Sequence, residues 1–179
     1  MAKRKPKNKP IPPNEGLDWL LHLTVTSFLF LIPKDWENLN KSLLEIKEII
    51  IHCSATREGQ DISVDTIRKW HVEGRGWSDI GYHFYIDING DIQKGRDISR
   101  SGAHCKNHNR NSIGVCYCGG VEADGKTPKD TRTEQQKLGL LHVLKTLKAM
   151  YPDAIIYSHN EFANKACPSF DATSEYKNL

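Results

Sequence analysis

Short runs of β-branched and apolar residues alternate with helix-forming segments along this chain, and that alternation limits its fold more than any other feature. The run Glu48–Cys53 predicts a buried strand, and Ser112–Cys118 and Ala154–Ser158 predict two more. Helical patterns separate these runs. Parallel strands need such long crossover connections, so the order of the segments favours an α/β fold.

One pair of neighbouring strands is predicted to form a hairpin. Residues 82–88 alternate in polarity, which places Tyr82 on the same strand face as Phe84. Asn89 and Gly90 follow as the strongest two-residue hairpin signal, after which the chain returns as the partner strand. A hairpin is antiparallel, so we expect a single domain with a central mixed sheet flanked by helices.

Two helices are delimited by their end residues. Ser63 is a suitable N-cap for the first, which ends at glycines. The apolar positions of this helix are Val64, Ile67 and Trp70. The second helix begins with a capping box of Thr133 and Gln136, and Pro152 stops it. Its apolar stripe consists of Leu140, Leu144, Leu147 and Tyr151.

Residues 1–43 are predicted to be an extension outside a domain that spans residues 44–179. The segment Leu20–Ile32 has 13 uncharged residues. A membrane helix needs roughly 20 apolar residues, whereas a signal-peptide core needs about 7–15. Two interpretations stay open, a helix or strand packed on the domain and an uncleaved signal anchor. The first is favoured over membrane association through residues 20–32.

The net charge of +3 comes from the N-terminal tail. Residues 1–10 hold five basic residues and no acidic one, which leaves 20 basic and 22 acidic residues and a charge of −2. The remaining chain therefore lacks the net positive charge that favours binding to nucleic acid. The five cysteines are an odd number, which disfavours a secreted disulfide framework and favours a reduced compartment, a metal ligand or a nucleophile.

Three residues are candidates for a reaction centre because of their place in the predicted sheet. His52 lies at the end of the first buried strand, His159 follows the last one, and Cys167 comes eight residues later. Ligands of α/β sheets bind beyond strand ends. Two imidazoles and a thiolate suit a three-ligand zinc site with one open position, which is the catalytic arrangement. Cys116 and Cys118 suit a buried strand face at least as well as a ligand pair.

Four longer segments occur in the order found in one known family. They are IIIHCSAT at 49–56, WSDIGYHFYIDINGDIQKGRD at 77–97, GAHCKNHNRNSIGVCYCGG at 102–120 and SHNEFANKACPSFD at 158–171. With these segments the chain resembles the zinc-dependent N-acetylmuramoyl-L-alanine amidases of type 2, especially small bacteriophage lysozymes of the amidase kind. Animal peptidoglycan recognition proteins share that fold. The resemblance covers residues from about 47 to 172, and residues 1–43 match nothing in the family.

The resemblance implies a site and a reaction. The matching positions are His52, His159 and Cys167 for zinc, Tyr82 and Lys165 for catalysis, and His104 and Asn111 for the substrate groove. The implied reaction is hydrolysis of the amide bond between N-acetylmuramic acid and L-alanine. The implied cofactor is Zn²⁺, and the implied partner is peptidoglycan or a muropeptide. Tyr82, Glu161 and a zinc hydroxide are the candidates for general base.

Two other functional classes stay open. A non-catalytic peptidoglycan-binding module is the first, although relatives that only bind typically lack the cysteine ligand. A cysteine peptidase that uses Cys53 or Cys167 is the second. Neighbouring strand residues point to opposite faces, so Cys53 is expected to face the core if His52 faces the site. The amidase is expected to be a monomer that acts on the wall in the periplasm or exterior, in phage or prophage lysis rather than host wall remodelling.

Overall fold

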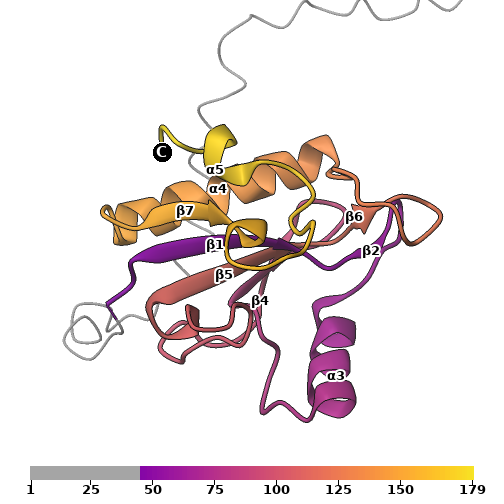
Figure 1. Cartoon of the computed structure of the whole chain (residues 1–179), viewed down its shortest axis with the longest axis horizontal. Helices are drawn as coiled ribbons and strands as arrows, with labels where there is room; N and C mark the ends of the chain where they lie inside the picture. Colours follow the sequence, from indigo (N-terminus) through magenta and orange to yellow (C-terminus); the bar gives the residue numbers. More distant parts are fainter. Residues whose placement is uncertain (1–44) are drawn as a thin grey trace, which may run out of the picture. The chain divides into compact units, whose positions relative to one another are not determined.

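A five-stranded sheet forms the centre of the fold in the computed structural model, which describes residues 45–179 (Figure 1). Its strands lie in the order β4-β3-β5-β1-β7, and β2 and β6 form a second, two-stranded sheet. The strands are β1 (Glu48–Cys53), β2 (Thr56–Arg57), β3 (Phe84–Ile86), β4 (Ile92–Lys94), β5 (Ser112–Tyr117), β6 (Gly120–Val121) and β7 (Ile155–Ser158). The helices are α3 (Val64–Arg75), α4 (Glu134–Met150) and α5 (Ala172–Glu175), with 3-10 turns η1 (Asn109–Asn111) and η2 (His159–Glu161).

The central sheet is mixed, which confirms the predicted architecture. β1 pairs in parallel with β5 and β7, and β3 pairs in parallel with β5. The hairpin partner β4 pairs antiparallel to β3. The described residues belong to one compact unit, Leu44–Leu179. Parallel strands buried on both faces read as continuous apolar runs, as β1 and β5 do.

The predictions for the N-terminal part fall on residues 1–44, outside the described residues. They include the extension 1–43 and the segment Leu20–Ile32, so the domain boundary stays a prediction. Among residues 45–179, no helix has both the length and the apolar character needed to cross a membrane.

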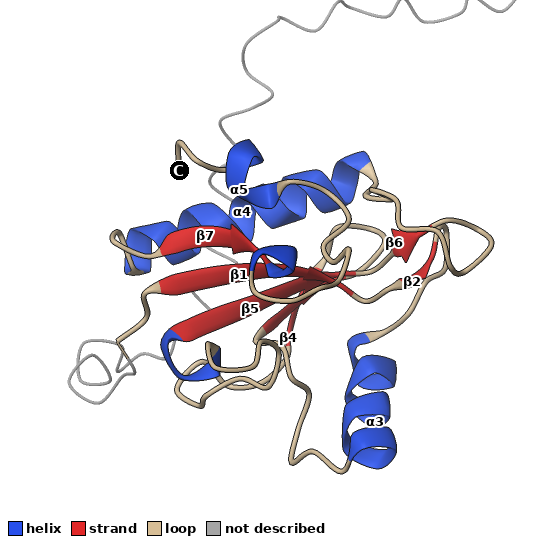
Figure 2. Ribbon diagram, viewed as in Figure 1, coloured by secondary structure: helices blue, strands red, loops and turns tan. Residues whose placement is uncertain are grey.

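The two longer helices lie on different faces of the sheet (Figure 2). Tyr85, Cys116 and His52 are aligned across β3, β5 and β1 by the strand register, so their side chains share one face. α3 packs its Ile67 against Tyr85 and Cys116 on this face. α4 approaches the side chain of Ile86, which points to the opposite face. His52 therefore projects from the face away from α4.

The first predicted helix is present as α3, but one of its predicted core positions is wrong. Ser63 is the N-cap, and its side chain accepts a hydrogen bond from the main-chain N–H of Thr66. Gly76 closes the helix in the left-handed conformation, with φ of 68°. The buried positions are Ile67 and His71, whereas the predicted core residue Trp70 is 46% exposed. With 3.6 residues per turn, the buried stripe continues four residues after Ile67 rather than three.

The predicted hairpin is also present, with a shorter strand and a longer turn. Asp87 and Asp91 close the turn through a main-chain hydrogen bond, and Gly90 adopts φ of 87°. β3 begins only at Phe84, so the predicted alternation does not extend to Tyr82. Tyr82 packs against the same cluster as Tyr85, which corrects its expected orientation.

The second predicted helix is α4. Its capping box has both expected hydrogen bonds, between Thr133 and Gln136. Leu140, Leu144 and Leu147 are fully buried, as the apolar stripe predicts. The helix ends before Pro152, which cannot supply a main-chain N–H. Burial of this stripe anchors α4 to the sheet face opposite His52.

Candidate metal centre

His52 lies at the penultimate position of β1 and is almost fully buried, with 1% of its surface exposed. Its ring centroid is 4.3 Å from that of His159 and 5.0 Å from that of His104. The ring of Tyr82 is 5.2 Å away. Because β1 is held by parallel neighbours on both sides, the extended backbone fixes the direction of this imidazole.

His159 follows the last residue of β7 and opens the turn η2. Ser158 and Glu161 form a capping box around this turn, and the Ser158 N–H donates to Glu161 Oε1 at 2.8 Å. The Ser158 hydroxyl accepts a hydrogen bond from the Ala172 N–H at 2.8 Å. These bonds hold the turn so that His159 lies beside His52.

The loop of Cys167 is tied to the strand ends by hydrogen bonds. The Cys53 N–H donates to Cys167 Sγ at 3.2 Å. The buried hydroxyl of Tyr117 donates to the Pro168 carbonyl at 2.7 Å, and the Ser169 hydroxyl donates to the Gly120 carbonyl at 2.7 Å. Cys167 is thus placed next to β1 although 114 positions separate it from Cys53.

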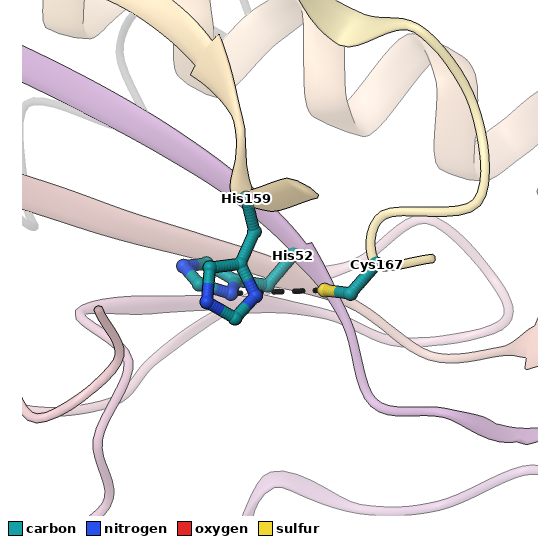
Figure 3. Close-up of side chains that lie close together, drawn as sticks. All are labelled: His52, His159 and Cys167. Carbon is teal, nitrogen blue, oxygen red and sulfur yellow. Dashed lines mark hydrogen bonds between the residues drawn. The ribbon is translucent and has the colours of Figure 1, made fainter. Parts of the chain in front are cut away.

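The three predicted ligands come together in the structure (Figure 3). One ligand atom from each of His52, His159 and Cys167 lies within 4.8 Å of the others, and His52 Nδ1 is 3.8 Å from Cys167 Sγ. His159 Nδ1 is buried and has no hydrogen-bond partner among the described residues. An unpaired buried nitrogen is costly, and a metal ion would satisfy it. Two nitrogens and one sulfur fit the donor preference of zinc.

Burial also sets the protonation of these groups. It lowers the pKa of His52 well below 6.5, and the neighbouring His104 and His159 add to this effect. Burial, with the charge of Lys165, lowers the pKa of His159. Both imidazoles are therefore neutral near pH 7 and have a lone pair for a metal. A hydrogen bond with the Cys53 side chain, together with burial, raises the pKa of the Cys167 thiol, so metal binding would displace its proton.

The sequence model of the N-acetylmuramoyl-L-alanine amidase family matches residues 42–170. The chain belongs to this family. The amidase is 46% identical over 127 residues to an endolysin of Enterobacteria phage K11, covering 71% of this chain and 83% of the relative. It is 47% identical over 123 residues to an endolysin of Escherichia phage T7, covering 69% and 80%. The protein is thus an N-acetylmuramoyl-L-alanine amidase, which hydrolyses the amide between N-acetylmuramic acid and L-alanine of peptidoglycan.

Solved structures share the fold of the amidase. An N-acetylmuramoyl-L-alanine amidase endolysin from Clostridium intestinale superposes with a TM-score of 0.64 at 25% identity, covering 75% of this chain and 82% of that one. The peptidoglycan recognition protein SA of the bumblebee superposes with a TM-score of 0.64 at 24% identity, covering 76% and 83%. The predicted fold class is therefore confirmed.

The two predicted catalytic residues of the amidase lie around the cluster. Tyr82 is partly buried, with its ring beside that of His52. Burial raises the pKa of Tyr82 well above 10, so its hydroxyl stays protonated and able to donate. Lys165 is exposed, and its charge acts on both His52 and His159. Tyr82 and Lys165 thus provide one neutral and one charged donor near the cluster.

The two residues predicted to line the substrate groove make contacts within the protein. His104 Nδ1 lies 3.0 Å from His52 Nε2. The side-chain amide of Asn111, the last residue of η1, donates to the main-chain carbonyl of Glu45 at 2.7 Å. Their roles toward substrate stay predictions.

Sequence reasoning missed the contact between His104 and His52. One signal for it was Gly114 in the middle of a predicted strand, since a strand glycine often marks the close approach of another group. A Cβ at Gly114 would lie 2.6 Å from the His104 ring. Glycine at this position therefore makes room for the imidazole beside β5.

Proposed function

We propose that this amidase is a zinc-dependent lytic enzyme in which His52, His159 and Cys167 hold the metal. The cluster of these three side chains, with the buried and unpaired His159 Nδ1, is the observation that carries the proposal. Zinc in this position would polarise a carbonyl as a Lewis acid and lower the pKa of a water molecule. Cys167 also distinguishes the enzyme from relatives that only bind peptidoglycan.

Tyr82 and Lys165 supply the electrostatic part of the mechanism. The Tyr82 hydroxyl stays protonated, so it donates a hydrogen bond to the carbonyl oxygen that gains negative charge as the amide is attacked. The positive charge of Lys165 stabilises the same developing oxyanion from the solvent side. In comparable sites, one such donor contributes about 3–4 kcal/mol to transition-state stabilisation.

Two of the candidate general bases are disfavoured by their surroundings. A tyrosine with a raised pKa holds its proton and is a poor base near neutral pH. Glu161 Oε1 accepts hydrogen bonds from the Ser158 N–H and the Thr173 hydroxyl. We therefore assign Glu161 to holding the turn that carries His159.

A role in phage lysis is supported by the relatives. The curated proteins that the chain matches at 44–47% identity are named endolysins of bacteriophages. An enzyme of this type degrades the wall of the cell in which it is made, consistent with cysteines that are free in the structure. Residues 44–179 are proposed to be the catalytic domain, and we expect a monomer.

The proposal is tested by mass spectrometry of purified peptidoglycan digested with the full chain. We expect free stem peptides that begin with L-alanine, and intact glycan strands, because only the amide bond is cut. A chelator should abolish these products, and added Zn²⁺ should restore them. His159→Ala should lose both bound zinc and activity, whereas His142→Ala on α4 should keep both.

Other outcomes would assign a different function. Binding of muropeptide without cleavage and without zinc would identify a non-catalytic module. Cleavage that persists in chelator but is abolished by thiol alkylation would identify a cysteine peptidase. Activity retained in His159→Ala would refute the metal assignment.

A further inference from the structure

The two ring nitrogens of His52 have different neighbours. Nδ1 lies 3.8 Å from Cys167 Sγ and belongs to the candidate metal cluster. Nε2 lies 3.0 Å from His104 Nδ1, on the other side of the ring. A neutral imidazole has one N–H and one lone pair, so these neighbours determine which nitrogen can bind a metal.

The hydrogen bonds beyond His104 decide where that proton lies. The Ser112 hydroxyl donates to the main-chain carbonyl of His108 at 2.7 Å, and a carbonyl can only accept. The single hydrogen of the Ser112 hydroxyl is taken up by this bond. Ser112 Oγ therefore accepts a hydrogen bond from His104 Nε2, which lies 3.3 Å away. Neutral His104 then has its lone pair on Nδ1. His52 must donate from Nε2, and its own lone pair is left on Nδ1.

The position of the His104 ring is fixed by its packing. A Cβ at Gly114 would lie 2.6 Å from this ring, and a Cβ at Gly102 would lie 2.5 Å from it. The His104 main-chain N–H donates to Asn109 Oδ1 at 2.7 Å. The imidazole therefore occupies a narrow slot between two glycines, oriented for both of its hydrogen bonds.

We propose that His104, Ser112 and the His108 carbonyl form a hydrogen-bond relay that holds His52 in its Nε2–H tautomer and presents the Nδ1 lone pair to the metal. His104 is then a positioning residue for the metal ligand. The proposal rests on the proposed role of His52 in binding zinc. Hydrogen-bond partners of this kind orient metal-bound histidines, and their loss typically weakens metal affinity about 10- to 100-fold.

A matched pair of variants at His104 tests the relay in the full-length protein. His104→Asn keeps an acceptor close to the position of Nδ1, whereas His104→Leu has a similar shape and no acceptor. Zinc affinity is measured by competition with a chromophoric chelator. We expect His104→Leu to bind zinc about 10- to 100-fold more weakly than the wild type, and His104→Asn to stay within about threefold. Equal affinity of His104→Leu and the wild type would overturn the relay.

Imidazole ¹⁵N spectra of the wild-type protein supply a readout that does not depend on any variant folding. We expect His52 to be protonated on Nε2 both with and without zinc, and His104 to be protonated on Nε2 as well. Protonation of His52 on Nδ1 in the metal-free protein would overturn the relay. A wild-type protein that binds no zinc would instead refute the proposed function, while the spectra of the metal-free protein still decide the tautomer.

Discussion

At the scale of single residues, the environment of each side chain decides its chemistry more than its type does. Eight histidines occur in the chain, and several of them are buried. His52 and His159 meet Cys167, whereas His71 accepts a hydrogen bond from the Gly81 N–H through Nδ1. The same imidazole is thus a candidate ligand in one place and a structural acceptor in another.

Tyr82→Phe removes the hydroxyl and leaves the ring. We expect kcat to fall about 10²- to 10³-fold, because a donor to the developing oxyanion is lost. Zinc content should stay at the wild-type level, since Tyr82 is outside the ligand set. Turnover of a defined muropeptide and metal analysis of the purified variant give both quantities. An unchanged kcat would remove Tyr82 from the mechanism.

His71 makes stability depend on pH. Burial lowers its pKa from 6.5 to about 4, so the unfolded chain binds a proton between these values and the folded protein does not. The contribution of His71 is complete above pH 6.5, is lost as pH falls toward 4, and amounts to on the order of 2–3 kcal/mol. Urea unfolding at pH 7 and pH 5 measures the part of this contribution that is lost between these two pH values.

His71→Asn is the matched control for this pH dependence. An asparagine places an acceptor near the position of Nδ1 and does not titrate. We expect the variant to lose less unfolding free energy than the wild type between pH 7 and pH 5. Equal losses would show that other groups cause the pH dependence, such as His83, whose pKa burial lowers to about 4.

At the scale of elements, strand ends and the loops beyond them build the site together. β1 and β7 end beside each other, so His52 and His159 become neighbours through strand pairing. Cys167 has no such strand, and its loop relies on hydrogen bonds from β5 and β1. We therefore expect mutations to displace Cys167 more easily than His52 or His159.

Tyr117→Phe tests this attachment. It removes the hydroxyl that donates to the Pro168 carbonyl and leaves that carbonyl buried without its partner. We expect the free energy of unfolding to fall by about 1–3 kcal/mol and zinc affinity to weaken with it. Urea denaturation and chelator competition measure the two effects. Tyr157→Phe is the control, because no hydrogen bond of its hydroxyl is found among the described residues, and a similar loss there would contradict the assignment.

At the scale of the domain, one buried cation joins the segment before α4 to the C-terminal helix. The Arg132 side chain is 2% exposed and pairs with Asp130 and Glu175 at 2.8 Å each. Its guanidinium carbon lies 3.3 Å from the ring centre of Phe170, in the loop that follows Cys167. Hydrogen bonds to these carboxylates raise the pKa of Arg132 and hold it charged despite its burial.

Arg132→Met should lower the free energy of unfolding by about 1.5–3 kcal/mol, because it removes the charge-assisted hydrogen bonds that the buried guanidinium donates to Asp130 and Glu175. The surface pair of Lys129 and Glu58 provides the contrast, since both side chains are nearly half exposed. Lys129→Met should lower the free energy of unfolding by less than about 1 kcal/mol. Guanidinium unfolding of both variants gives the comparison. Similar losses of unfolding free energy in the two variants would show that burial of Arg132 does not strengthen its ion pairs.

Much of this fold can be predicted from the sequence, because helix caps and strand patterns depend on residues that are close together in the chain. The caps at Ser63 and Thr133 and the strand run of β1 depend on neighbours within a few residues. The failures are also local in origin. Trp70 fits a three-residue spacing but falls outside the stripe that packing buries, and Tyr82 precedes the strand to which its alternation assigned it.

The chain by itself determined the order of the elements, their caps and the three residue types that meet at the strand ends. Tertiary structure alone decided which atoms of those residues face each other. His52 and His104 are 52 positions apart, and only strand register and the slot beside Gly114 bring their rings together. The reason is physical, since backbone propensity acts over one turn, whereas the tautomer of His52 depends on hydrogen bonds that exist only after the sheet has paired.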